Sequence, residues 1–184
     1  MIRALLDANV IYPAPLRDLL FSIAAEEVFQ PLWTKQINEE WVKNLLQNRP
    51  DISRSQLQRT CDLMDKAFPM ALIEGYENLI SKLELPDSDD RHVLAAAIKS
   101  EADILVTFNL KDFQQGYINQ FGVEVKHPDH FLCTLFERKP NSCVTAFKKM
   151  HNRLKHPPIP KWKLLDTLKV NDIKQFPALL KPLL

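Results

Sequence analysis

Short apolar runs, rich in β-branched residues, alternate along this chain with longer segments of helical periodicity, and this alternation restricts the folds it can adopt. Brief apolar runs favour strands, whereas apolar positions three and four residues apart favour helices. The expected strands lie at residues 3–6, 28–33, 70–73, 104–107 and 123–125. Strands separated by helices predict an α/β fold around a mainly parallel sheet.

Capping residues place two helices. Thr34 is expected to cap a helix whose buried face includes Ile37 and Trp41 and which ends by Pro50. Ser53 is expected to cap the next helix in the same way. The pattern therefore predicts two consecutive helices after the second strand.

The remaining helical signals lie later in the chain. Residues 87–102 open with acids, which favour a helix N-terminus, and continue with an apolar stripe, so we expect one helix there. Beyond Pro128 the pattern is helical throughout, and the proline-rich segment 156–161 separates a final Leu-rich piece. We therefore expect a first unit at 1–128 and a basic helical extension at 129–184.

The formal charge of +1 conceals an uneven distribution. Residues 1–137 carry 13 Lys and Arg against 21 Asp and Glu, a charge of −8, and residues 138–184 carry 11 against 2, a charge of +9. A basic tail of this kind favours an anionic partner, which is either nucleic acid or the acidic face of the chain itself. Both readings stay open from the sequence.

Several function classes have no sequence signature here. With three glycines and no Gly-rich phosphate loop, a dinucleotide cofactor is not expected. The three cysteines have no C-x-x-C spacing, so neither a disulfide framework nor a zinc ribbon is indicated. Asp7 follows the N-terminus too closely for a signal peptide or a membrane span, so we expect a cytoplasmic protein.

Acidic and polar residues occur where a parallel sheet would bring them together. In such a sheet, functional groups gather beyond the carboxyl ends of the strands. Taken singly, each of these residues could be a helix cap or belong to a solvated surface. A joint cluster of carboxylates is costly unless cations neutralise it, and hard oxygen ligands suit Mg²⁺ or Mn²⁺. The candidates are Asp7, Glu40, Asp87, Asp90, Asn109 and Asp112.

The segments that carry these residues resemble one known family, the PIN domains. They read LLDANVIYP at 5–13, INEEW at 37–41, DSDDRHVLAAAI at 87–98 and ILVTFNLKDF at 104–113. The resemblance covers roughly residues 2–127, and the order and spacing are similar to the branch that contains the VapC-type toxins. It implies a three-layer α/β/α sandwich around a central parallel sheet and a Mg²⁺- or Mn²⁺-dependent endoribonuclease.

The resemblance also implies a role for each acid. The four residues that resemble the family's metal-binding and catalytic acids are Asp7, Glu40, Asp90 and Asp112. Asp87 resembles an accessory acid of one branch, and Asn109 occupies a polar position that is an acid in some relatives. We expect Asp87 and Asn109 to orient ligands or water from just outside the metal. The asparagine lowers the local negative charge and leaves open whether one metal ion binds or two.

The extension departs from the minimal family domain, so its role is argued from composition. Basic residues interleaved with aromatics could follow an RNA backbone while a ring stacks on a base. The alternative is a helical lid or partner-docking segment whose charge offsets the acidic domain. The candidate RNA-binding residues are Lys148, Lys149, Arg153, Lys155 and Trp162.

Three functions therefore remain. The first is a ribonuclease toxin held inactive by a cognate antitoxin, with RNA as substrate, no membrane partner and a homodimer compatible with the family. The second is a catalytically silent PIN-like module that binds RNA or protein. The third is a phosphoacceptor fold that uses Asp7, but a phosphatase of that kind usually has a second Asp where this chain has Asn9. The RNA target is not indicated by the sequence.

Overall fold

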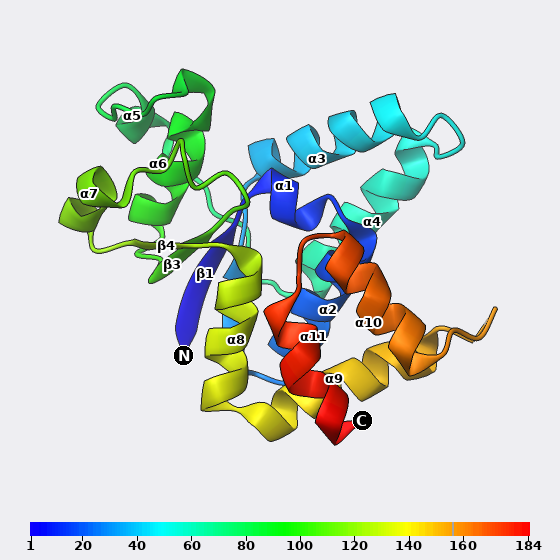
Figure 1. Cartoon of the computed structure of the whole chain (residues 1–184). Coiled ribbons are helices and arrows are strands. Elements are labelled where there is room, and N and C mark those ends of the chain that lie inside the picture. Colours follow the sequence, from blue (N-terminus) through cyan, green and yellow to red (C-terminus); the bar gives the residue numbers. More distant parts are fainter. Residues whose placement is uncertain (156) are drawn as a thin grey trace.

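A computed structural model describes residues 1–155 and 157–184, and its centre is a parallel sheet (Figure 1). The strands are β1 (Ile2–Leu6), β2 (Phe29–Leu32), β3 (Ile104–Val106) and β4 (Glu124–Lys126), in the order β2-β1-β3-β4. Every neighbouring pair is parallel. The predicted α/β class and parallel sheet are confirmed.

The expected strand at 70–73 is wrong. This segment makes a single parallel bridge between Trp33 and Leu72, with the Trp33 amide donating to Ala71 and the Ile73 amide donating to Trp33. Its partner Trp33 is the residue just after the end of β2, and it is the residue to which the segment is bridged. The segment therefore extends the sheet edge locally without forming a strand of its own.

Local sequence fixes the two helices expected after β2. The Thr34 hydroxyl accepts a hydrogen bond from the Ile37 amide at 3.0 Å and caps α3 (Lys35–Asn48). Ser53 and Gln56 form a reciprocal capping box at the start of α4 (Arg54–Ala67). Both predictions are confirmed.

The single helix expected over 87–102 begins differently. Asp87 caps a short 3₁₀ turn, η1 (Ser88–Asp90), and the α-helix α6 (Arg91–Lys99) follows it. A tighter turn of this kind is common at a helix N-terminus, and here it contains Asp89 and Asp90. The other elements of the first unit are α1 (Ala8–Ile11), α2 (Ala14–Ala24), α5 (Glu77–Ile80), α7 (Gln115–Ile118) and η2 (Asn119–Phe121).

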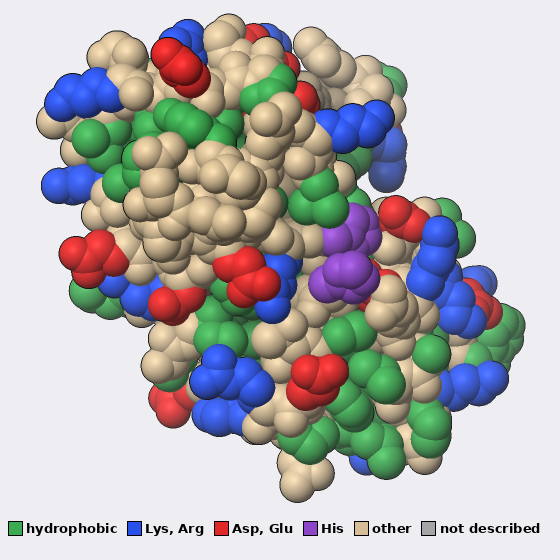
Figure 2. All heavy atoms as spheres, turned by 60° about the vertical axis from the view of Figure 1, so that its left-hand side comes forward, with side chains coloured by type: hydrophobic (Ala, Val, Ile, Leu, Met, Phe, Trp, Pro, Cys, Tyr) green, Lys and Arg blue, Asp and Glu red, His purple; other side chains and the backbone are tan. Residues whose placement is uncertain are grey.

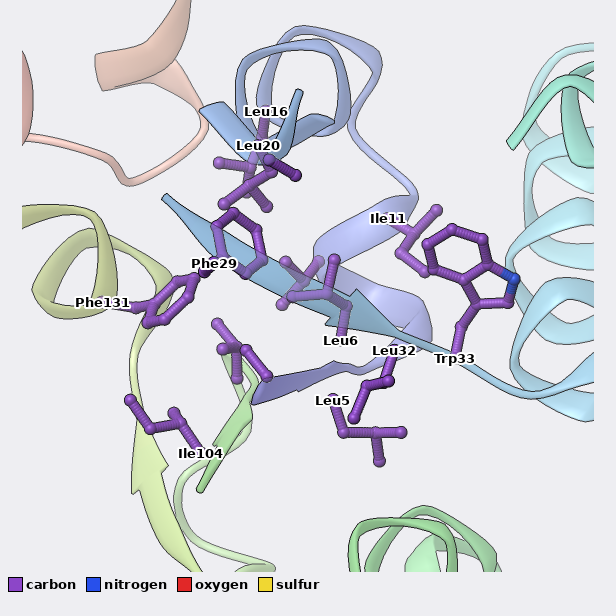
Figure 3. Close-up of a cluster of buried hydrophobic side chains, with 14 of the residues drawn as sticks. Leu5, Leu6, Ile11, Leu16, Leu20, Phe29, Leu32, Trp33, Ile104 and Phe131 are labelled. Atoms are coloured by element: carbon purple, nitrogen blue, oxygen red, sulfur yellow. The ribbon is translucent and has the colours of Figure 1, made fainter. Parts of the chain in front are cut away.

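Helices cover both faces of the sheet (Figure 1). Leu6 and Phe29 point toward Leu16 and Leu20 of α2, whereas Leu5 and Leu32 point to the opposite face (Figure 3). On that second face α6 contacts β1 and β3. The alternation of side chains along each strand thus produces the expected α/β/α layering.

The chain beyond β4 is helical, as predicted, and lies on the α2 side of the sheet (Figure 1). Phe131 packs edge-on against Phe29 at 5.0 Å between ring centroids, and α9 contacts α2. No helix in residues 1–155 or 157–184 is long and apolar enough to cross a membrane. The elements are α8 (Pro128–Arg138), α9 (Pro140–Arg153), α10 (Lys161–Val170), α11 (Gln175–Leu180) and η3 (Lys181–Leu183).

Candidate active site

Asp7 directly follows β1 and caps α1, and the residue is almost fully buried at 5% exposure. Oδ1 accepts from the Ala8 amide at 2.6 Å. Oδ2 accepts from the Thr107 hydroxyl and from Asn9 Nδ2, each at 2.7 Å. The strand, the helix N-terminus and the neighbouring strand therefore fix this carboxylate in one orientation.

Thr107 and Asn9 link the ends of β1 and β3, and neither residue was predicted to belong to the site. The Asn9 side chain donates to Thr107 Oγ1 at 3.1 Å and accepts from the Phe108 amide at 3.2 Å. Thr107 Oγ1 also accepts from the Asn109 amide at 3.0 Å. Thr107 could have been predicted from the sequence, because it is the polar last residue of the strand expected at 104–107. Functional groups gather at the carboxyl ends of such strands.

Three of the candidate acids converge. Each of Asp87, Asp90 and Asp112 offers a carboxylate oxygen within 4.8 Å of the others, with Asp87 exposed and the other two half-buried. Asn109 donates to Asp112 Oδ2 through its side-chain amide. Asp87 was expected to orient ligands from just outside the metal. In the structure it belongs to the same group as Asp90 and Asp112.

Burial and repulsion between like charges change the acidity of this site. Burial and the charges of Asp7, Asp87 and Asp112 together raise the pKa of Asp90 to about 7, with burial the largest cause and His92 opposing the shift. Asp90 Oδ2 is buried and accepts no hydrogen bond from the described residues. The pKa of Asp7 is also raised, mainly by burial, although its hydrogen bonds oppose the shift.

Glu40 lies on α3, outside the group of three, and meets α6. Its Oε1 is 2.8 Å from Nε2 of the buried His92 and accepts from Gln36 Nε2 at 3.3 Å. Glu40 is close enough for its charge to contribute to the raised pKa of Asp7. Asp7 and Glu40 thus lie outside the group of three, and Asp7 is linked to it because its charge contributes to the raised pKa of Asp90.

The residues of this site suit a hard divalent cation. Carboxylate oxygens are the ligands that Mg²⁺ and Mn²⁺ prefer, and a cation removes the cost of crowding like charges. The buried, unpaired Asp90 Oδ2 is the observation that fits best, because an atom of this kind otherwise needs a donor. The donor set of oxygens without thiolates argues against a zinc site.

The predicted RNA-binding residues are placed elsewhere. Lys149 pairs with Glu26 at 2.7 Å, and Arg153 donates to the Ser22 hydroxyl of α2. Lys148 and Lys155 are exposed, and Trp162 at the start of α10 is 63% exposed. All five residues are exposed, and two of them, Lys149 and Arg153, also contact side chains of the first unit.

Comparison with known proteins gives two adjacent matches. A family model described as PIN domain matches residues 3–111, and one described as VapC50 C-terminal domain matches residues 128–182. The chain is 33% identical over 104 residues to a protein of Mycobacterium tuberculosis (strain ATCC 25618 / H37Rv) named "Putative ribonuclease VapC50". This alignment covers 56% of the chain and 60% of that relative. No solved structure matches the chain.

Proposed function

The chain belongs to the PIN-domain family, and on that premise we propose that it is a metal-dependent endoribonuclease that hydrolyses phosphodiester bonds of RNA. The observation that carries the proposal is the convergence of Asp87, Asp90 and Asp112 within 4.8 Å, near enough to the buried Asp7 for its charge to act on Asp90. A neutral polar cluster would fill a purely structural role at lower cost, because it would not bring like charges together.

We assign Asp7, Glu40, Asp90 and Asp112 as the catalytic acids that hold Mg²⁺ or Mn²⁺. When bound, the metal activates water and stabilises the leaving oxygen of a phosphodiester. The proximity of Asp87 to Asp90 and Asp112 supports a direct ligand role for Asp87, beyond the orienting role that the resemblance implied. Calorimetric titration with Mn²⁺ gives the number of ions that bind.

The polar network around Asp7 orients the site. Thr107 and Asn9 fix the Asp7 carboxylate, and Asn109 holds the Asp112 carboxylate through its side-chain amide. Fixed ligands keep the substrate phosphate aligned without reorganisation during the reaction. We expect products with a 5′-phosphate and a 3′-hydroxyl.

We propose that the biological role is that of a toxin restrained by a cognate antitoxin in the cytoplasm. Support comes from the relative named as a VapC50 ribonuclease and from the match of residues 128–182 to the C-terminal domain of the same name. A gene for a small antitoxin beside the gene for this chain would support the assignment. A co-purified small protein that suppresses cleavage would establish it.

We propose that the extension binds RNA. The residues that would contact it are Lys148, Lys149, Arg153, Lys155 and Trp162. The exposed Lys148, Lys155 and Trp162 favour it. The contacts of Lys149 and Arg153 with α2 and its following turn favour the competing docking role. Lysines and arginines on one face are interspersed with acids and do not gather into one patch (Figure 2). The salt dependence of RNA binding, with and without residues 138–184, separates the two.

The alternative function is a PIN-like module that binds RNA or protein without cutting. It is favoured only by Asn109, which stands where some relatives have an acid. Cleavage of RNA by purified protein, compared with the Asp7→Asn variant and with excess EDTA, tests the two functions. Metal-dependent cleavage that is lost in the variant supports the nuclease, and full activity of the variant contradicts it.

A further inference from the structure

A buried histidine contacts one of the proposed metal ligands. His92 lies in the first turn of α6 and is 4% exposed, and its Nε2 is 2.8 Å from Oε1 of Glu40 on α3. A carboxylate accepts hydrogen bonds and does not donate them, so Nε2 carries the hydrogen. The contact joins two helices that approach the acidic site from different parts of the chain.

The other ring nitrogen of His92 indicates that the imidazole is not a simple packing residue. Nδ1 is buried and has no hydrogen-bond partner among the described residues. Leaving a polar atom unpaired in this way costs about 1–3 kcal/mol. An apolar side chain would pack α6 against its surroundings without that cost. The feature that an apolar residue would lack is the Nε2–H group directed at Glu40.

The arrangement around Glu40 suits a role in positioning. Gln36 Nε2 also donates to Oε1, at 3.3 Å, so both donors hold the same oxygen. The second oxygen, Oε2, is therefore the one available to a ligand. The Glu40 side chain is 37% exposed, and without a rigid partner a long carboxylate at such a position would occupy several rotamers.

We propose that His92 is a positioning residue that holds the Glu40 carboxylate in its metal-binding orientation. The inference rests on the proposed metal-dependent function, because it assigns a role toward the same site. His92 itself does not contact the metal. Its effect passes through Glu40 alone, and this distinguishes the role from a general contribution to folding.

The test is the affinity for Mn²⁺, measured by calorimetric titration of the full chain. His92→Leu keeps the bulk of the ring and removes the donor, and we expect it to weaken Mn²⁺ binding about 10- to 100-fold. His92→Gln restores a side-chain N–H and should recover most of that loss. In a Glu40→Ala background, His92→Leu should have no further effect on affinity, because the two residues act as a unit.

His151 provides the matched control. It also has a buried Nδ1 without a partner in the described residues, and its Nε2 lies 2.7 Å from the Ile159 carbonyl on the extension. His151→Leu should therefore leave Mn²⁺ affinity unchanged. Wild-type affinity in His92→Leu, or an equal loss with and without Glu40, would overturn the proposal.

Nitrogen NMR of the metal-free wild-type protein tests the contact without relying on a folded variant. We expect a slowly exchanging proton on His92 Nε2. A proton on Nδ1 alone would refute the positioning role even if Mn²⁺ binds. Absence of Mn²⁺ binding to a protein that shows the expected ring proton would instead refute the metal-dependent function, and the role of His92 with it.

Discussion

The Thr107 hydroxyl donates a hydrogen bond to Asp7 Oδ2 at 2.7 Å, and this contact joins the carboxyl ends of the two central strands. Asp7 has no freedom to turn toward solvent, because its other oxygen is held by the Ala8 amide. The acid that ends β1 is thus positioned by a residue 100 places later in the chain.

Replacing Thr107 with Val should reduce metal-dependent cleavage about 10- to 100-fold, since partners of metal ligands typically contribute this much. The shape of the side chain is kept, and the hydroxyl that donates to Asp7 and accepts from Asn9 and Asn109 is lost. Thr107→Ser keeps the hydroxyl and is the control, expected to retain most of the activity. Rates of cleavage at saturating Mn²⁺ measure the effect, and equal rates for the Val and Ser variants would contradict it.

The raised pKa of Asp90 predicts how stability of the metal-free protein depends on pH. Between the ordinary carboxyl pKa and about 7, the folded protein binds more protons than the unfolded chain. The free energy of unfolding should therefore fall as pH rises through that window. Asp90→Asn should flatten this dependence, as urea unfolding at several pH values would detect.

Asp166 is an exposed carboxylate on α10, and Asp166→Asn is the control. It shows how the loss of a surface carboxylate by itself changes the pH dependence of the free energy of unfolding. Mn²⁺ should stabilise the wild-type protein most at the high end of the window, because the cation replaces the proton. An Asp90→Asn variant with the same pH dependence as the wild-type protein would show that another group is responsible.

Asp129 is expected to hold the last helix in place. Its buried carboxylate accepts from the amides of Lys174, Gln175 and Phe176, the residues that open α11. Asp129→Ala removes these acceptors and should destabilise the fold by about 1–3 kcal/mol. Thermal unfolding measures the loss. Amide hydrogen exchange of residues 174–184 should quicken first, and an unchanged exchange rate there would contradict the capping role.

Two neighbouring lysines test the RNA-binding proposal for the extension. Both are exposed, but Lys149 is paired with Glu26. If Lys148 contacts a phosphate, Lys148→Ala should reduce the slope of log affinity against log salt by about 1. Lys149→Ala should change the slope less, because its charge already has a partner. Equal slopes for Lys148→Ala and the wild-type protein would remove Lys148 from the RNA footprint.

Local sequence predicted the elements whose signals lie within one segment. Thr34 and Ser53 cap the helices they were assigned, because a cap needs only its own next turn. The resemblance to the PIN domain is likewise confirmed by the match of residues 3–111. The strand expected at 70–73 failed because strand formation depends on a partner elsewhere in the chain.

The acids of the site could be predicted from the sequence, but the pairing of each acid with its hydrogen-bond partner could not. Acids after strand ends and at the start of the helix before β3 could be proposed from topology, and the structure does bring Asp87, Asp90 and Asp112 together. The contacts of Thr107 with Asp7 and of His92 with Glu40 depend on side chains that are distant in sequence. Spacing along one segment carries no information about such pairs.

Cleavage of a mixed cellular RNA pool tests the central proposal most directly. The purified wild-type protein is compared in Mn²⁺ and in EDTA with the Asp90→Asn variant, after any bound antitoxin has been removed. We predict cleavage by the wild-type protein in Mn²⁺ only, and none by the variant. Cleavage that persists in EDTA or in Asp90→Asn, or its absence from antitoxin-free wild-type protein in Mn²⁺, would contradict the assignment as a metal-dependent ribonuclease.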